Sequence, residues 1–275
     1  MNKWIITLII GAFIMQSCDQ IDGNFGDGNG TTPPDTGLVR KVLIEDYTGH
    51  TCGNCPRAAL ALDPLKALYG DDLIILSVHA GFFALPQLPD YPADFQTQVG
   101  DDIDQFFGVS AAGNPNGMVN RKEVNGNPIL AYTSWGSEIA NNITLAPDAK
   151  IEMTSTYDSG TREIDLSVIT EFVNSASGTY KMSAYLVEDN VISDQKNYDV
   201  TPEHVINYNH RHMLRGSFNG SWGDAVNSTV NTPQQFDYNL TLSTDFDENN
   251  ISIISFIYED GSKEIIQVEE HHITP

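Results

Sequence analysis

Two cysteines separated by two residues constrain this chain more than any other feature. Cys52-Gly53-Asn54-Cys55 is followed directly by Pro56. An apolar run from Val42 to Tyr47 precedes the pair, and apolar residues at helical spacing follow it from Ala58 to Leu68. The pair therefore stands where a strand passes into a helix. Pro56 suits the first turn of that helix, because the N–H groups of a first turn have no partner inside the helix.

This position at a helix start predicts chemistry for the pair. Free N–H groups and the helix dipole favour negative charge there, so the pKa of a thiol falls below its free value of about 8.5. We expect Cys52, nearer the end and more exposed, to attack, and Cys55, one turn further in, to resolve the mixed disulfide. One alternative is a purely structural Cys52–Cys55 disulfide. Another is a zinc or copper site that adds His50 and His79.

The order of strand, Cys-Gly-x-Cys, helix and second buried strand (Leu73 to Val78) resembles the start of a thioredoxin fold. The resemblance implies that Asp46, six residues before Cys52, is the buried acid that assists the resolving cysteine. Glu45 is the alternative acid if the register differs by one residue. Gly113-Asn114-Pro115 resembles the cis-proline loop of that fold. We therefore expect a cis bond between Asn114 and Pro115, with Pro115 shaping the substrate groove.

The first 37 residues predict export and attachment to a membrane. The apolar run from Trp4 to Met15 is shorter than the roughly 20 residues that span a bilayer. It ends at Met15-Gln16-Ser17-Cys18, which resembles the lipobox of bacterial lipoproteins. We expect residues 1–17 to be a signal peptide and Cys18 to carry lipid; an ordinary cleaved signal with an incidental cysteine is the alternative. Residues 18–37 are rich in Gly, Asp, Asn and Pro and predict a flexible tether.

The pattern changes to period two after residue 147. Alternating apolar residues predict strands at Ile164–Ile169, Tyr180–Val187, Phe236–Leu242, Ile251–Tyr258 and Glu264–Val268. Short strands separated by turns are typical of an antiparallel β-sandwich, immunoglobulin-like in outline. We therefore expect an α/β thioredoxin-like domain over residues 38–147, with further helices at 93–107 and 135–142, followed by an all-β immunoglobulin-like sandwich domain over residues 148–275.

Two groups of motifs resemble one protein family. Glu45-Asp46-Tyr47-Thr48-Gly49 and Cys52-Gly53-Asn54-Cys55-Pro56 are similar to the first motif of the Omp28-related outer-membrane lipoproteins of Bacteroidetes. The segments Tyr208–Gly216 and Gly220–Asp224 resemble the second-domain signature of that family. The resemblance covers nearly the whole mature chain and implies an outer-membrane lipoprotein on the periplasmic or surface face. The resemblance implies no settled biochemical activity.

The charge balance excludes one class of partner. The chain has 14 Lys and Arg against 37 Asp and Glu, with no basic cluster, so we expect no nucleic-acid binding. His204, His210 and His212 lie near one another, and His210 and His212 would share one face of a strand and could chelate a metal. No carboxylate or cysteine is placed beside them by spacing. We therefore expect neither a metal site nor a cofactor.

Two function classes compete for this sequence. The first is a thiol–disulfide oxidoreductase of the cell envelope, whose partner is an envelope or extracellular protein. The second is a non-catalytic binding or adhesion module in which the disulfide is structural. A reversible, exposed Cys52 favours the first class, whereas an inert, buried disulfide favours the second.

The N-terminal sequence generates a prediction about attachment. Mass spectrometry of the protein purified from membranes should show a chain that begins at an acylated Cys18. Because one acyl chain binds membranes weakly and several anchor stably, Cys18→Ala should move the protein from the membrane to the soluble fraction. An unmodified Cys18, or cleavage at another position, would contradict the prediction.

Overall fold

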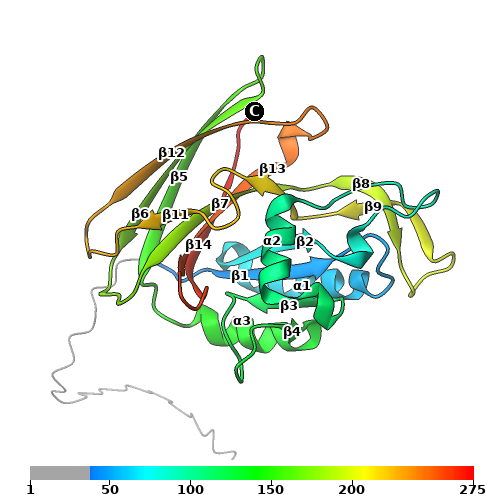
Figure 1. Ribbon diagram of the computed structural model, residues 1–275, viewed down its shortest axis with the longest axis horizontal. Coiled ribbons are helices and arrows are strands. Elements are labelled where there is room, and N and C mark those ends of the chain that lie inside the picture. Colours follow the sequence, from blue (N-terminus) through cyan, green and yellow to red (C-terminus); the bar gives the residue numbers. More distant parts are fainter. Residues whose placement is uncertain (1–37) are drawn as a thin grey trace, which may run out of the picture. The chain divides into compact units, whose positions relative to one another are not determined.

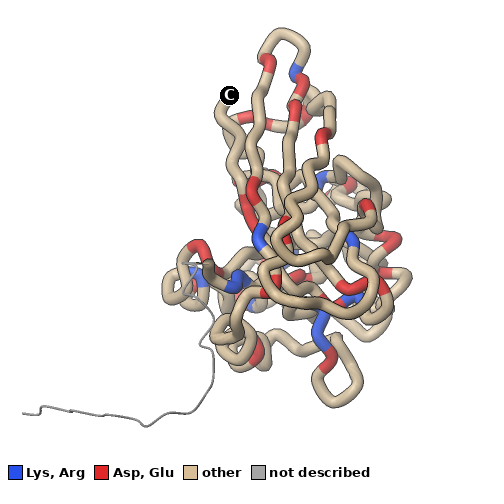
Figure 2. Tube along the Cα trace, turned by 90° about the vertical axis from the view of Figure 1, so that its left-hand side faces the viewer, with Lys and Arg blue, Asp and Glu red and all other residues tan. Residues whose placement is uncertain are grey.

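The computed structural model describes residues 38–275, which form mostly strands with few helices (Figure 1). The expected signal peptide, tether and lipidation at Cys18 lie outside the described residues. Within residues 38–275, no helix is long and apolar enough to cross a membrane. Asp and Glu are scattered along this part of the chain, with the fewer Lys and Arg among them (Figure 2).

Strand β1 (Val42–Thr48) is the centre of the first half. It pairs in parallel with β2 (Leu73–His79) and antiparallel with β3 (Asn116–Val119), which pairs in turn with β4 (Leu130–Ala131). Helix α1 (Cys55–Tyr69) makes the crossover that a parallel β1–β2 pair requires. Because both faces of β1 and β2 are covered, residues of both strands are buried almost without interruption rather than at alternate positions, including the two acids of β1.

The helices cover the two faces of this part of the sheet. Apolar residues of α1 and α3 (Trp135–Ile143) pack on the face of β1 that carries Val42 and Ile44. Helix α2 (Gln98–Phe107) packs on the opposite face. The helix expected at 93–107 is shorter than predicted and begins at Gln98. The hydroxyl of Thr97 accepts a hydrogen bond from the Gly100 N–H (3.0 Å) and so caps the helix at that point.

The large sheet continues into the second half of the chain. Met213 of β10 (Met213–Ser217) pairs in parallel with Ser77 of β2. The sheet order is β14-β13-β7-β10-β2-β1-β3-β4, in which the remaining strands are β7 (Tyr180–Glu188), β13 (Ile251–Glu259) and β14 (Ile265–His272); β11 (Asp224–Val226) also pairs with β7. Strands from before and after residue 147 therefore share one sheet, and the expected domain boundary stays a prediction.

A second sheet faces the large one. It consists of β5 (Ala149–Asp158), β6 (Glu163–Phe172) and β12 (Gln234–Thr241) in the order β12-β6-β5. Its inward residues form one apolar core with those of β7 and β13. The five strands expected from period two coincide with β6, β7, β12, β13 and β14. A separate hairpin of β8 (Val191–Lys196) and β9 (His204–His210) was not anticipated (Figure 1).

A buried arginine, ion-paired within the first half, also contacts the second half. The Arg121 guanidinium, wholly buried, donates to both carboxylate oxygens of Glu45 on β1 at 2.7 and 2.8 Å. It also lies 5.0 Å from the ring centroid of Phe256 on β13 and 5.7 Å from that of Phe107 on α2. A charge this far from water is tolerated only when it is paired and hydrogen-bonded. Arg121 therefore holds β1, α2 and β13 together.

This pair predicts the effect of removing either partner. Arg121→Met or Glu45→Gln leaves an uncompensated polar group in the core and should lower the free energy of unfolding by about 3–5 kcal/mol. Urea unfolding followed by circular dichroism measures the change. As a control, Glu248→Gln breaks the Arg162–Glu248 pair (2.7 Å), which lies at the surface and should leave stability nearly unchanged. Equal small effects at both pairs would contradict the prediction.

Candidate functional site

Cys52 and Cys55 form a disulfide between the end of β1 and the start of α1. Cys52 lies in a turn closed by a hydrogen bond from its N–H to the Gly49 carbonyl (3.0 Å). The helix begins at Cys55, and Pro56 occupies its first turn, as the sequence predicts. The sulfur of Cys55 therefore stands at the positive end of the helix dipole.

The expectation that Cys52 is the more exposed cysteine is wrong. Cys52 and Cys55 are each 2% exposed. Part of the β8–β9 hairpin, from the second half of the chain, lies on the loop that carries Cys52: the Gln195 side-chain amide donates to the Cys52 carbonyl (3.1 Å) and the Tyr198 N–H donates to the Gly53 carbonyl (2.9 Å). The contact spans more than 140 residues of sequence, so nothing near the cysteines indicates it.

The two neighbouring acids of β1 have different surroundings. Glu45 is bound by Arg121 on one face of the strand. Asp46 lies on the other face, which α1 covers, because side chains alternate along a strand. Asp46 is 1% exposed, and its Oδ1 atom has no hydrogen-bond partner. Burial raises the pKa of Asp46 to about 7. Asp46 can therefore exchange a proton near neutral pH.

The proline loop has the expected conformation. The bond between Asn114 and Pro115 is cis, as predicted. It directly precedes β3, whose Asn116 pairs with Tyr47 near the end of β1. This register places Pro115 beside the end of the strand that leads into the cysteine loop. The side chain of Asn114 is buried, and neither of its polar atoms has a hydrogen-bond partner.

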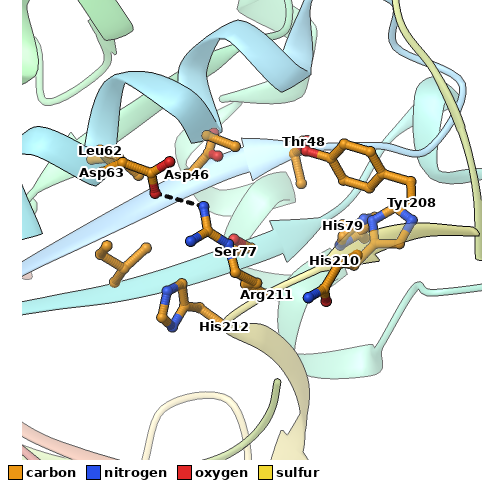
Figure 3. A pocket seen from close by; sticks show the side chains of 13 residues that line it. Asp46, Thr48, Leu62, Asp63, Ser77, His79, Tyr208, His210, Arg211 and His212 are labelled. Atoms are coloured by element: carbon orange, nitrogen blue, oxygen red, sulfur yellow. Dashed lines mark hydrogen bonds and ion pairs between the residues drawn. The ribbon is translucent and has the colours of Figure 1, made fainter. Parts of the chain in front are cut away.

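A cavity of ≈ 40 Å³ lies beside Asp46 (Figure 3). That volume is enough for one or two water molecules. Its walls come from β1, β2, α1 and the segment that joins β9 to β10, and include Thr48, Asp63, Ser77, His79, Tyr208, His210, Arg211 and His212. Arg211 donates to Asp63 on α1 at 2.7 Å, across the ends of these elements (Figure 3).

Residues from both groups of motifs found in the sequence line this cavity. Asp46 belongs to the first motif, Glu45 to Gly49. The opposite wall belongs to the second signature, Tyr208 to Gly216. The two segments are about 160 residues apart in the chain and meet because β10 pairs with β2. The residues that carry the family resemblance therefore converge on one place in the fold.

Three histidines surround one aromatic ring near this cavity. The ring centroids of His79 and His210 each lie 5.2 Å from that of Phe95, and the centroid of His50 lies 5.4 Å from it. Burial lowers the pKa of all three imidazoles: that of His79 well below its usual value, that of His210 to about 4, and that of His50 more moderately. They are neutral at pH 7, so His50 does not supply the positive charge expected to favour a Cys52 thiolate.

The other expected histidine pair is not formed. His210 and His212 do not share a face, because the chain turns between β9 and β10, where His212 has a φ of 55°. His212 Nδ1 lies 3.4 Å from Asp189 Oδ1, whereas the His210 ring packs against His79. Within residues 38–275, no three His, Cys, Asp or Glu side chains are arranged to hold a metal ion.

Comparison with known proteins identifies the family. The family model described as outer membrane protein Omp28 matches residues 101–275. The chain belongs to the Omp28 family. This membership confirms the resemblance drawn from the motifs and places the protein at the outer membrane of the cell envelope. A search of curated proteins found no match.

Two solved structures of Porphyromonas gingivalis are similar to this Omp28-family protein. The first is HBP35, which is 18% identical with a TM-score of 0.67; the match covers 86% of this chain and 76% of that one. The second is a domain of the outer membrane lipoprotein Omp28, which is 20% identical with a TM-score of 0.33; that match covers 48% of this chain and 92% of the other. The first likeness shows that HBP35 and this protein have a similar fold.

The raised pKa of Asp46 predicts a pH dependence of stability. The folded state holds a proton up to about pH 7. The unfolded chain releases that proton at about pH 3.9. Rising pH therefore lowers stability between about pH 4 and 7, by about 1.4 kcal/mol per unit of pKa difference.

Asp46→Asn removes this contribution. The free energy of unfolding of the variant should rise relative to the unmodified protein as the pH increases from 4 to 8. Urea unfolding of the oxidised proteins at pH 4, 6 and 8 measures the difference. Parallel curves for the two proteins would show that Asp46 ionises normally.

Proposed function

We propose that this Omp28-family protein exchanges disulfides with other proteins of the cell envelope through a thioredoxin-like unit formed by residues 38–147. The observation that carries the proposal is the Cys52–Cys55 disulfide at the start of α1, with Asp46 buried and unpartnered on the strand that leads into it. The β1–α1–β2 crossover, the antiparallel β3 and the cis bond before Pro115 support the same assignment. Residues 148–275 form the expected immunoglobulin-like part.

The exchange needs only the two cysteines and a partner dithiol. A partner thiolate attacks the Cys52 sulfur, a mixed disulfide forms, and the Cys52–Cys55 bond breaks with its electron pair on Cys55. The start of α1 stabilises the departing thiolate, and Asp46 supplies it with a proton. The second partner thiolate then attacks the partner sulfur and releases Cys52. The partner is oxidised by two electrons and the protein is reduced; the reverse order reduces a partner disulfide.

The expected anchor fits this setting. We propose that lipid on Cys18 attaches the protein to the outer membrane and that residues 19–37 form a tether for the folded unit. A domain that exchanges disulfides with several partners benefits from such reach, because a Gly-rich tether lets it sample many orientations.

A second function is favoured by one observation. Both cysteines are 2% exposed, which is the behaviour expected of a structural disulfide. In this alternative the protein is a non-catalytic binding module. The loop that follows β2 would contact the partner, since Phe82 and Leu88 are 68% and 80% exposed there.

A trapping experiment separates the two functions. In Cys55→Ser protein, a mixed disulfide formed at Cys52 cannot be resolved, so covalent adducts with envelope proteins should accumulate. Non-reducing electrophoresis followed by mass spectrometry detects them. Cys52→Ser is the matched control and should trap nothing, because the attacked sulfur is absent. Absence of adducts with correctly folded Cys55→Ser protein would favour the binding module.

A further inference from the structure

The loop that carries Cys52 is paired with an extended segment of the β8–β9 hairpin. This segment, residues 195–199, is called the strap. The Lys196 N–H donates to the His50 carbonyl (2.8 Å), and the Tyr198 N–H donates to the Gly53 carbonyl (2.9 Å). The Gln195 side chain donates to the Cys52 carbonyl (3.1 Å). The strap thus occupies backbone acceptors on both sides of Cys52, as an added peptide strand would.

One glycine of the motif is shaped to receive the strap. The ring of Tyr198 packs so closely on Gly53 that a Cβ atom at position 53 would lie 2.6–2.7 Å from three of its atoms. Any side chain at this position would therefore push Tyr198 away. The absence of a side chain at Gly53, the first residue between the two cysteines, therefore suits the packing of the strap as well as the turn.

The strap is buried at Gln195, which is 2% exposed, whereas Tyr198 and Asp199 bury little surface. Its hairpin forms a sheet of its own and pairs with no strand of the other two sheets. Asp199 is joined to Arg57 of α1 by two hydrogen bonds (2.6 and 2.8 Å), but both side chains are more than two-fifths exposed. Tyr198 is 48% exposed. The His204 ring, further along the hairpin, lies 4.8 Å from that of Tyr91.

Segments with exposed hydrogen bonds and little buried apolar surface open at low free-energy cost. By contrast, the disulfide of the loop to which the strap is bound is almost fully buried. The exposed end of the strap, Tyr198 and Asp199, is therefore the part of this contact that opens most easily.

We propose that the strap is displaceable and gates the disulfide, and that the substrate is an extended polypeptide bearing a cysteine. Its backbone N–H groups replace those of Lys196 and Tyr198 at the His50 and Gly53 carbonyls. This inference rests on the proposed disulfide exchange for its substrate, whereas the gating itself is measurable with any small reductant. The extended form follows from the spacing of the two donors, because Lys196 and Tyr198 are alternate residues and the N–H groups of alternate residues point to the same side of an extended backbone.

The gating is tested in the full chain by the rate at which dithiothreitol reduces the disulfide. This reductant is neutral near pH 7, so a change of protein charge does not alter its approach. Tyr198→Ala should raise the rate on the order of tenfold, because it removes the half-buried ring. Asp199→Asn should raise it roughly twofold, because exposed ion pairs contribute little. Glu248→Gln, which makes the same charge change at the distant Arg162 pair, should leave the rate unchanged.

Hydrogen exchange of the oxidised proteins provides an independent measure of opening. The amides of Lys196 and Tyr198 should exchange faster in Tyr198→Ala than in the unmodified protein. Faster exchange with an unchanged reduction rate would overturn the gating, because the strap would then open without exposing the disulfide. Unchanged exchange and rate together would show that the strap is a fixed part of the fold.

Gly53→Ala tests the contact between Tyr198 and Gly53 by a change in the cysteine loop instead of the strap. The added methyl group should displace Tyr198 and raise the reduction rate. In the double variant, Tyr198→Ala should add no further increase, because both changes remove one contact. Full additivity of the two effects would mean that Gly53→Ala acts on the cysteine turn and would contradict the proposed fit.

The failure of the proposed function is seen separately. When Tyr198→Ala is combined with Cys55→Ser, more adducts with envelope proteins should form than with Cys55→Ser alone. If Tyr198→Ala speeds reduction by dithiothreitol but no adduct forms, the gating proposal stands. The same result would overturn both the disulfide exchange with proteins and the polypeptide substrate.

Discussion

The buried guanidinium of Arg121, paired with Glu45 and packed against rings of β13, is the group on which the arrangement of the two halves depends. A guanidinium without contact to water requires a carboxylate partner, and Glu45 on β1 supplies it. The aromatic rings of Phe256 and Tyr258 on β13 surround the same cation. Next to it, Asn120 accepts a hydrogen bond from the Leu43 N–H through its side chain (2.8 Å) and one from the Ile265 N–H through its carbonyl (2.8 Å). One short turn thus fixes β1 to strands of the second half.

With the halves held in this way, the site is made by both. The cysteine loop, Asp46 and Pro115 come from the first half, whereas the strap and the far wall of the cavity come from the second. The continuous sheet explains this: β10 pairs with β2, so the segment that precedes β10 is brought against the middle of α1. The second half therefore contributes residues to the site that contains Asp46 and the cysteine loop.

Burial has opposite consequences for the groups at this site. It makes His50, His79 and His210 neutral, and it gives Asp46 a pKa at which it can donate or accept a proton near pH 7. The start of α1 favours a thiolate at the cysteines. The same burial hides the disulfide from solvent. With the gating proposed above, the protein would carry a reactive disulfide in an oxidising compartment without exchanging it indiscriminately.

The sequence by itself determined the features that depend on nearby residues. The strand-to-helix position of Cys52 and Cys55, the place of Pro56, the five period-two strands, the cis bond at Pro115 and the family all follow from local periodicity or short motifs. Only the tertiary structure decided what depends on distant residues. Glu45 is paired with Arg121, so Asp46 is the acid without an ion-pair partner. Tyr198 packs on Gly53, between two cysteines that a helix start alone would expose. These two pairs of partners are 76 and 145 residues apart, and no local pattern encodes such contacts because they arise only when the sheets assemble.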